Sequence, residues 1–404
     1  MTKQIVIIGG GAAGFFAAIT CAEQNPNVQI TILEKSTTVL QKVKVSGGGR
    51  CNVTHACFDP QELITFYPRG GKELLGPFHQ FMTGDTMQWF EERGVPLKIE
   101  EDNRVFPVSN SSQSIVDVLI NSATKNNIVI KTSHRVESIE KIENQWKVTT
   151  SNGVFLADKL LVATGSNTHV WKLINQSRHT IIEPVPSLFT FNCDDNRIKE
   201  IPGVSVPHVT IKITGTNLET NGPLLITHWG MSGPAILKLS AFGARLLADK
   251  QYQFSIEINW LSKSYESVFN QLSSFKKSLA KKQLLPNSPF EAIPKRLWEK
   301  LINYASISGN KNWADLSKSD VEQLANLLTQ SIFEINGKST FKEEFVTAGG
   351  VDLKEVNFKR FESKLHKDLF FAGEALDIDA ITGGFNFQNA WTGGYIAGKA
   401  MAEN

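Results

Sequence analysis

The feature that most constrains the fold is the run IVIIGGGAAG at residues 5–14. Its apolar, mostly β-branched start predicts a buried strand, and the following FFAAITCAEQ predicts a helix. Between them, Gly9 permits a tight turn, Gly11 lets backbone approach a diphosphate, and Gly14 lets helix and strand pack closely. The order of strand, turn and helix predicts a dinucleotide-binding site.

The next segment, VQITILEKS, predicts a second strand that ends at Glu34. Glu34 follows Gly14 at the spacing where a carboxylate accepts hydrogen bonds from ribose hydroxyls. An acid here disfavours an NADP 2′-phosphate. The alternative, a glycine turn that binds nothing, does not account for the strand, the helix and the spaced acid together. This fingerprint fits NAD as well as FAD.

Three further segments favour FAD. The loop KVKVSGGGRCNVT places N–H groups and Arg50 where they can contact phosphate or the flavin edge, although it is also readable as a flexible surface loop. KLLVATG and LFFAGEALDID predict buried strands with small-residue ends, and Glu374 follows the second. A helix after Gly384 could stabilise anionic reduced flavin. The candidate contacts from these motifs are Gly9, Gly11, Ala12, Gly14, Gly49, Cys51, Ala163, Thr164, Gly165, Gly373, Gly384 and Phe385.

These segments together resemble the bacterial family of NAD(FAD)-utilising dehydrogenases or aminoacetone oxidase-like FAD-binding proteins, which includes the BaiN-type flavoproteins. The resemblance also includes NRVFPVSNSS, THWGMSGPAIL, VTAGGV and the terminal FFAGEALDIDAITGGFNFQNAW, so it covers nearly the whole chain. It implies FAD as the cofactor. The contacts that it implies are Ala13, Glu34, Lys35, Lys42, Ser46, Arg50, Asn52, Val136, Glu374 and Asn386.

The expected fold class is α/β, a Rossmann-like FAD-binding domain of the glutathione reductase type that is interrupted by an insertion. Residues 1–186 and 341–404 are expected to form the FAD-binding domain. Alternating patterns, with the family resemblance, predict an inserted β-barrel at 187–261, and helical patterns predict a helical subdomain at 262–340. DTMQWFEERG and VPLKIEEDNRVFPVS predict a helix followed by a β-hairpin.

The amino-acid composition limits which binding partners are expected. A net charge of +2 argues against a nucleic-acid partner, and the run KKSLAKK is interpreted as a solvated helix face. No apolar run is long enough for a membrane span, so a cytoplasmic location is expected. Four scattered cysteines predict reduced thiols, and Cys51, His55 and Cys57 do not form a zinc pattern, so no metal is expected. The oligomeric state is left open.

No nucleophile or metalloprotease motif is present, in keeping with flavin chemistry, in which hydride moves at N5 of the ring. His228 is the one catalytic candidate, as an acid or base, against the alternative that its ring bonds the adjacent turn. Only one dinucleotide fingerprint occurs, so NAD(P)H or oxygen remains open as the redox partner of a small-molecule oxidoreductase. The alternatives are an amine oxidase that produces hydrogen peroxide and a flavin-bound protein with an RNA-linked or regulatory role.

Overall fold

The computed structural model describes residues 2–339 and 346–403. The chain forms two compact units, of which the first combines Met1–Val185 with Val346–Asn404 and the second is Pro186–Phe345. The predicted boundary between residues 340 and 341 lies outside the described residues. A two-stranded sheet of β11 (Ile181–Ser187) and β19 (Val346–Val351) forms where the chain leaves and re-enters the first unit.

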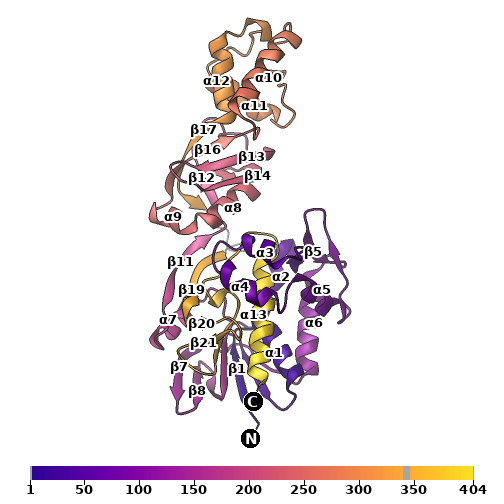
Figure 1. The fold of residues 1–404 in the computed structure, drawn as a ribbon, viewed down its shortest axis with the longest axis vertical. Helices are drawn as coiled ribbons and strands as arrows, with labels where there is room; N and C mark the ends of the chain where they lie inside the picture. Colours follow the sequence, from indigo (N-terminus) through magenta and orange to yellow (C-terminus); the bar gives the residue numbers. More distant parts are fainter. Residues whose placement is uncertain (1, 340–345, 404) are drawn as a thin grey trace. The chain divides into compact units, whose positions relative to one another are not determined.

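A seven-stranded sheet forms the core of the first unit, in the order β20-β21-β22-β10-β1-β2-β6 (Figure 1). Its last five strands are parallel, and nearly all residues of β1 and β10 are buried, as expected for a sheet covered on both faces. The predicted Rossmann-type α/β fold is therefore confirmed. The strands are β1 (Gln4–Ile8), β2 (Gln29–Leu33), β6 (Val129–Lys131), β10 (Lys159–Val162), β20 (Val356–Asn357), β21 (Glu362–Ser363) and β22 (Leu369–Phe371).

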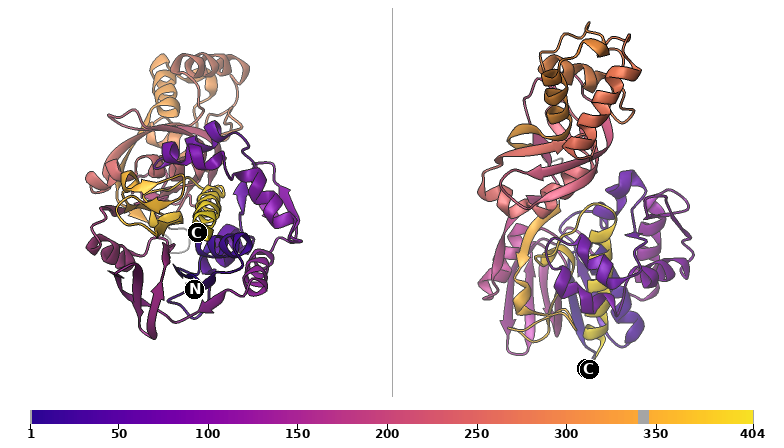
Figure 2. Two further views of the ribbon diagram at one scale, coloured as in Figure 1. Left: turned by 60° about the horizontal axis from the view of Figure 1, so that its bottom comes forward. Right: turned by 45° about the horizontal axis from the view of Figure 1, so that its top comes forward.

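Two helices from opposite ends of the chain pack along each other in this unit. They are α1 (Ala12–Gln24) and α13 (Phe385–Ala402), drawn in indigo and yellow (Figure 1). A Cβ at Gly394 would lie 2.7 Å from the Ala13 carbonyl oxygen, and one at Gly398 would lie 2.6 Å from that of Ala17. Glycines are required at both positions because the backbones approach so closely. The first and last described segments consequently lie near each other (Figure 2), and Lys3 Nζ donates to the Glu403 carbonyl at 3.4 Å.

Smaller elements complete the first unit. The predicted helix and hairpin are present as α5 (Thr83–Glu91), β4 (Leu97–Ile99) and β5 (Arg104–Pro107), and β5 also pairs with β3 (Thr54–His55). A second antiparallel sheet consists of β7 (Val136–Ile142), β8 (Gln145–Thr150) and β9 (Gly153–Ala157). The remaining helices are α2 (Gln41–Gly49), α3 (Pro60–Leu63), α4 (Gly71–Phe78), α6 (Ser112–Lys125) and α7 (Thr168–Gln176), with 3-10 turns at Ile64–Phe66, Leu353–Glu355 and Gly373–Ala375 (η4).

The second unit contains a sheet that closes on itself. Its order is β17-β16-β13-β14-β15-β12-β18, and β17 and β18 at the two ends are one stretch of chain interrupted at Gly337. Asn192 N–H donates to the Gly337 carbonyl at 3.0 Å beside this junction. The sheet is thus a small barrel. Its strands are β12 (Thr190–Asn192), β13 (Ser205–Ile213), β14 (Glu219–Ile226), β15 (Gly230–Ser232), β16 (Gln253–Asn259), β17 (Ser331–Asn336) and β18 (Lys338–Ser339).

Helices flank and extend the barrel. The strand, glycine turn and helix expected around THWGMSGPAIL are β14, β15 and α8 (Pro234–Phe242), followed by α9 (Ala244–Asp249). The helical subdomain predicted at 262–340 contains α10 (Tyr265–Ser278), α11 (Lys295–Tyr304) and α12 (Lys318–Thr329), with a 3-10 turn at Trp313–Asp315. Its predicted end is wrong, because residues 331–339 form β17 and β18 of the barrel. The buried rings of Trp298 and Trp313 stack at its centre. In the described parts of the chain, no helix is both long and apolar enough to cross a bilayer.

Candidate functional site

The glycine turn between β1 and α1 has the geometry that a dinucleotide requires. Gly9 has φ +114°, and a Cβ there would lie 2.3 Å from the Ala163 carbonyl oxygen. A Cβ at Gly14 would lie 2.1 Å from the Gly9 carbonyl oxygen, so the helix could not pack on the strand with a larger residue. A Cβ at Gly11, by contrast, would meet no atom within 4 Å. Gly11 therefore borders open space, where a diphosphate fits at the N-terminus of α1.

Glu34 is held at the end of β2, beside this turn. Its two carboxylate oxygens accept from the backbone N–H groups of Gly10 and Ser36, each at 2.9 Å. A carboxylate has about four acceptor positions, so two remain for ribose hydroxyls. Gly10 and Ser36 had not been predicted as part of the site, because a backbone donor leaves no signal in side-chain identity. The arrangement fits the predicted role of Glu34.

Three of the predicted contacts meet although they are far apart in sequence. Lys42 Nζ lies 2.5 Å from Glu374 Oε2, and a Cβ at Gly165 would lie 3.3 Å from the same oxygen. Gly373 adjoins Ala13, since a Cβ on Gly373 would lie 3.3 Å from the Cβ of Ala13. The ends of β10 and β22 and the start of α2 therefore converge at the carboxyl ends of the parallel strands, where open α/β sheets bind their ligands.

The glycine-arginine loop begins as a helix. Residues after Leu40 form α2, but Ser46, Gly47 and Gly48 depart from helical geometry, and Gly47 and Gly48 have positive φ. The expected loop is thus confined to the end of the segment. Arg50 is held by Glu100 at 2.7 Å and lies over the Phe106 ring at 3.9 Å.

The residues after Arg50 contact the start of α13. Trp391 Nε1 donates to the Val53 carbonyl at 2.9 Å, and Thr54 Oγ1 donates to Gln388 Oε1 at 2.6 Å. A Cβ at Gly384 would lie 2.6 Å from the Thr54 carbonyl, which explains glycine there. Two predicted segments, one from each end of the chain, therefore form one wall of the site.

The first turn of α13 carries two predicted contacts with different surroundings. Asn386 uses its side-chain amide to bond both the N–H and the carbonyl of Ala380, at 3.0 and 3.1 Å, and so fixes the preceding turn. The Phe385 ring is buried against Phe66, and its carbonyl accepts from the Tyr67 hydroxyl at 2.6 Å, so its backbone N–H is the group that can approach a ligand. The first turn contains no acidic residue. A helix N-terminus without acidic side chains favours a neighbouring negative charge.

Two buried polar atoms at the site have no hydrogen-bond partner among the described residues. They are Asn52 Oδ1 and Thr164 Oγ1. Buried polar atoms are nearly always paired, so an unpaired one calls for an explanation such as a missing ligand or water. Both belong to segments predicted to contact FAD. Together with the space at Gly11 and the free acceptor positions of Glu34, these atoms fit the cofactor.

The remaining predicted contacts lie at the edges. The Lys35 side chain is exposed next to Glu34. Val136 is buried, and its carbonyl accepts from His169 Nε2 at 3.0 Å. His169 lies at the start of α7, where the sequence departs from the glycine-rich stretch usual in the resembled family and Asn167 caps the helix instead. Ala12 begins α1, and Gly49 ends α2 with φ +82°.

All four cysteines of the chain are buried, and none forms a disulfide. Cys51, Cys57, Cys21 and Cys193 are all free thiols. Burial raises the pKa of the Cys51 thiol to about 12, so it stays protonated at neutral pH. Thiol nucleophiles and metal ligands act as thiolates. Cys51 therefore packs beneath the loop as a small apolar residue.

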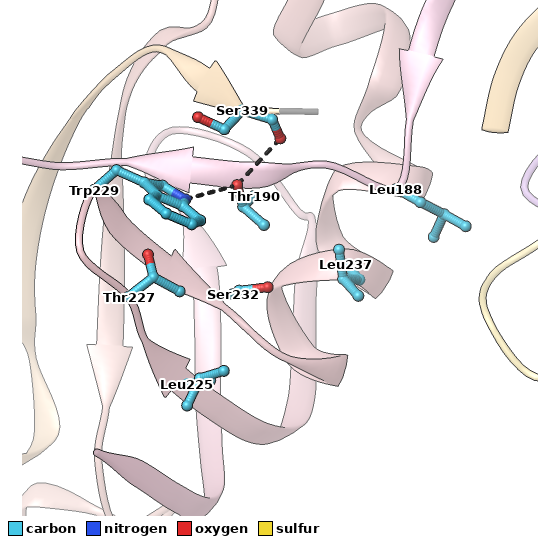
Figure 3. A pocket seen from close by; sticks show the side chains of 8 residues that line it. All are labelled: Leu188, Thr190, Leu225, Thr227, Trp229, Ser232, Leu237 and Ser339. Atoms are coloured by element: carbon cyan, nitrogen blue, oxygen red, sulfur yellow. Dashed lines mark hydrogen bonds between the residues drawn. The ribbon is translucent and has the colours of Figure 1, made fainter. Parts of the chain in front are cut away.

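His228 lies in the second unit, on the turn between β14 and β15, and its side chain is exposed. His228 belongs to the barrel of the second unit. The adjacent residues Thr227 and Trp229 line a cavity in that barrel (Figure 3). This cavity had not been predicted from the sequence.

Comparison with known proteins places these features in a family context. The model of the family described as HI0933-like protein Rossmann domain matches residues 3–400. The chain is 27% identical to a 3-dehydro-bile acid delta(4,6)-reductase of Clostridium scindens, over 99% of both chains. It is 29% identical to a ribosomal RNA dihydrouridine synthase of Haemophilus influenzae, over 99% of this chain and 98% of that protein. The resemblance to BaiN-type flavoproteins is confirmed.

The fold is also similar to that of solved structures. A 3-ketosteroid-delta4-(5alpha)-dehydrogenase from Rhodococcus jostii RHA1 has a TM-score of 0.54 and 12% sequence identity, with 100% of this chain and 97% of that chain covered. At this identity the likeness concerns the fold alone. It supports the α/β assignment and leaves the substrate open.

Proposed function

Since the chain belongs to the HI0933-like protein Rossmann domain family and is an FAD-dependent oxidoreductase, we propose that it reduces a ring carbon–carbon double bond conjugated to a carbonyl group. The observation that carries the proposal is the chemistry that two full-length relatives have in common. A delta(4,6)-reductase acting on a 3-dehydro bile acid reduces double bonds conjugated to a ketone. A dihydrouridine synthase adds two hydrogens across the uracil double bond, which is conjugated to a carbonyl.

Bound FAD would supply the hydride chemistry that the reduction of such a double bond requires. The chain's part is to hold and orient the cofactor. Glu34 would hold the ribose, Gly11 would leave room for the diphosphate, and Lys42 and Glu374 would contact the central part of the cofactor. The first turn of α13 favours the negative charge that remains on a reduced ring system. Hydride delivery therefore needs no catalytic triad.

The α-carbon of the substrate must also receive a proton, and a side chain or solvent has to supply it. His228 stays the candidate, because it is exposed on the turn beside the barrel cavity. We propose a reduced nicotinamide as the electron donor for the flavin. Because the chain has one dinucleotide fingerprint, the nicotinamide would bind in the substrate position before the substrate does. The hydride and the proton together add two electrons and two protons across the double bond.

A local charge favours RNA over a free steroid as the substrate. Residues 262–330 carry ten Lys and Arg residues against six Asp and Glu residues, a net charge of +4, whereas the whole chain has +2. Lys277, Lys281 and Lys282 are exposed, and no side-chain hydrogen bond or ion pair holds them in the described part of the chain. Unpaired lysines on one lobe are suited to phosphates. The whole-chain charge had hidden this local excess.

The test uses holoenzyme photoreduced without oxygen and then mixed with protein-free ribosomal RNA or with a 3-oxo-Δ4 steroid. The expected result is return of the oxidised flavin absorbance with RNA, and a gain of two hydrogens at uridine by mass spectrometry of the digested RNA. Reduced flavin that persists with both compounds, with neither product formed, contradicts the proposal. Glu34→Ala protein, expected to lack FAD, serves as the control for chemistry that does not need the cofactor.

A further inference from the structure

We propose that His55 binds a proton when the flavin is reduced and releases it when the flavin is reoxidised. This inference rests on the proposed function, in which the flavin lies at the first turn of α13 and is reduced and reoxidised in each cycle. His55 is the last residue of β3, and in the sequence it stood out only as part of a rejected zinc pattern. All the residues that carry the proposal belong to the first unit.

His55 contacts the turn that leads into α13. Its Nδ1 lies 3.2 Å from the Gly383 carbonyl oxygen, and a Cβ at Gly384 would lie 2.6 Å from the Thr54 carbonyl. The end of β3 and this turn are therefore in direct contact. Gly384 is a predicted FAD contact, and so is Asn52, three residues before His55, whose buried Oδ1 has no partner among the described residues. His55 is thus next to two segments that are expected to touch the cofactor.

The hydrogen bond to Gly383 determines which ring nitrogen of His55 can titrate. A carbonyl oxygen only accepts, so Nδ1 carries a hydrogen and donates it. In the neutral ring the other nitrogen, Nε2, is then unprotonated. No hydrogen bond or ion pair holds Nε2 in the part of the chain that the structure describes, and the residue is only half-buried, so solvent can reach the ring. Nε2 is therefore the atom that gains and loses the proton.

Aromatic surroundings keep His55 neutral before the flavin is reduced. Its ring packs on Phe385 with centroids 4.5 Å apart, and against Phe66 with centroids 5.8 Å apart. Burial lowers the pKa of His55 from its ordinary value, although the hydrogen bond to the Gly383 carbonyl favours the charged form. A histidine with a lowered pKa is mostly neutral at pH 7. Nε2 is thus free to accept a proton.

The charged groups that face His55 come from three elements. Beyond the effect of burial, Asp102 in the β4–β5 turn and Glu62 on α3 raise the pKa of His55, whereas Arg104, its partner across β3 and β5, lowers it. Asp102 also holds the Arg104 guanidinium at 2.7 Å. The 3-10 turn Ile64–Phe66 and the first turn of α13 contain no charged residue. No carboxylate is paired with His55, so its charge can follow that of the cofactor.

Reduction of the flavin changes the electrostatic balance at His55. The negative charge that remains on a reduced ring system would lie beside the turn that His55 contacts, where the first turn of α13 favours it. An opposite charge within about 4–6 Å shifts a pKa by about 1–3 in favour of the charged form. Such a rise takes His55 from mostly neutral to mostly charged near neutral pH. The ring therefore takes up a proton as the flavin takes up electrons.

The atoms and electrons balance over one cycle. The reduced nicotinamide supplies a hydride, which carries two electrons and one proton, and solvent supplies the second proton, which binds at Nε2 of His55. When the double bond is reduced, the hydride leaves the flavin and His55 returns to its neutral form. One nicotinamide is oxidised, one double bond gains two hydrogens, and one proton is consumed from solvent. His55 thus holds the proton that matches the one gained by the substrate's α-carbon.

The test follows His55 by NMR in holoenzyme labelled with ¹³C at Cε1 of its eight histidines. The His55 signal is identified by its absence in His55→Asn, whose amide can still donate to the Gly383 carbonyl, or in His55→Gln if the first variant loses flavin. The titration midpoint of His55 is expected to be about 1 pH unit or more higher in photoreduced than in oxidised protein. Equal midpoints overturn the proposal, even if dihydrouridine is formed. A shifted midpoint in an enzyme that forms no dihydrouridine overturns the proposed function alone.

The pH dependence of the flavin's reduction potential gives a second readout. Each proton taken up with two electrons changes the equilibrium tenfold per pH unit, or about 30 mV. Between the two His55 midpoints the wild-type curve is expected to be steeper by this amount, and His55→Asn should lack the steeper segment.

The matched control for the potential measurement is His134→Gln. The Nδ1 of His134 also lies near a backbone carbonyl, that of Thr132 at 2.7 Å, but its backbone N–H bonds Glu34 at the ribose end of the site. This variant should keep the steeper segment. Persistence of the segment in His55→Asn, or its loss in both variants, overturns the proposal. Flavin content and thermal midpoint are measured for each variant, so that a folding defect is not read as a lost proton.

Discussion

Lys42 Nζ and Glu374 Oε2 lie 2.5 Å apart across 332 positions of sequence, joining the start of α2 to the end of β22. The Lys42 side chain is 64% exposed and that of Glu374 is 16% exposed. An ion pair this open to solvent contributes at most about 1 kcal/mol to stability. Its position between Gly165 and the glycine turn suggests that its purpose is to place two polar groups at the cofactor.

Glu374→Gln is therefore expected to lower FAD affinity about 10-fold or more while the thermal midpoint of the apoprotein changes little. The reason is that a charged acceptor for a cofactor hydroxyl is replaced by a weaker neutral one. Titration of apoprotein with FAD, followed by flavin fluorescence, gives the affinity. Lys295→Met serves as a control, because Lys295 is an exposed ion-pair partner of Glu299 in the second unit. An apoprotein destabilised as strongly as its FAD binding is weakened would identify a structural role instead.

Gly11 and Gly14 provide a matched pair for separating binding from folding. Gly11→Val places its side chain in open space, so the apoprotein should keep its thermal midpoint but purify with little FAD. Gly14→Ala forces a methyl group to within 2.1 Å of the Gly9 carbonyl oxygen and should destabilise the apoprotein by about 1–3 kcal/mol or more. Denaturant unfolding and flavin absorbance distinguish the two. Near-stoichiometric FAD in Gly11→Val would refute the assignment of the diphosphate position.

The glycine turn after β1 and the carboxylate beside it were predictable because their geometry depends on residue identity. Gly9 and Gly14 must be glycine to avoid backbone carbonyls, and Glu34 must be an acid at a strand end, so spacing alone reveals them. The sequence indicated the strands and helices of the insertion through their periodicity. Closure of these strands into a barrel was expected only with the help of the family resemblance. Periodicity does not reveal it, because the barrel is closed by β17, which pairs with β16, and by β18, which follows Gly337 and pairs with β12.

What the sequence did not reveal depends on backbone atoms or on tertiary neighbours. The N–H groups that fix Glu34 come from Gly10 and Ser36, whose side chains play no part in those bonds. Thr227 reads as an ordinary strand-end threonine until its hydroxyl proves to be shielded and unpaired. His228, the residue singled out by chemistry, is exposed, whereas its two neighbours line the cavity. Residue type alone could not distinguish these three positions.

Lys159 ties the end of α13 to the central sheet. Its buried ammonium donates to the carbonyls of Ala400, Met401 and Glu403, at 3.3, 3.1 and 2.6 Å, which are the free carbonyls at a helix C-terminus. Lys159→Met should destabilise the protein by about 1–3 kcal/mol, because buried carbonyls lose their donor. Lys3→Met removes a long, solvent-exposed hydrogen bond to the same carbonyl of Glu403 and should cost less than about 0.5 kcal/mol. If Lys159→Met and Lys3→Met lowered the free energy of unfolding in urea equally, the helix-capping role of Lys159 would be contradicted.

His179 should make the first unit sensitive to acid. Its ring is buried between Ser177 and Ser363, and burial together with nearby His366 lowers the pKa of His179 to about 4. An unfolded histidine titrates near pH 6.5. Between about pH 6.5 and 4 the unfolded chain therefore binds a proton that the folded chain does not, and the free energy of unfolding falls as the pH falls. In the His179→Gln variant, the thermal midpoint should depend less on pH between about pH 4 and 6.5. An unchanged dependence would show that other groups cause the loss of stability in acid.

The reaction of reduced enzyme with oxygen separates the proposed reductase from the amine oxidase alternative. A reductase that passes electrons to a carbon–carbon double bond gains nothing from fast oxygen reduction, so photoreduced holoenzyme mixed with air should stay reduced for many minutes. An oxidase would reoxidise within seconds and release hydrogen peroxide. Stopped-flow absorbance at the flavin band and a peroxide assay record the two outcomes. Reoxidation within seconds, together with peroxide release that a primary amine stimulates, would favour the oxidase. The proposed reduction of a conjugated double bond would then be wrong.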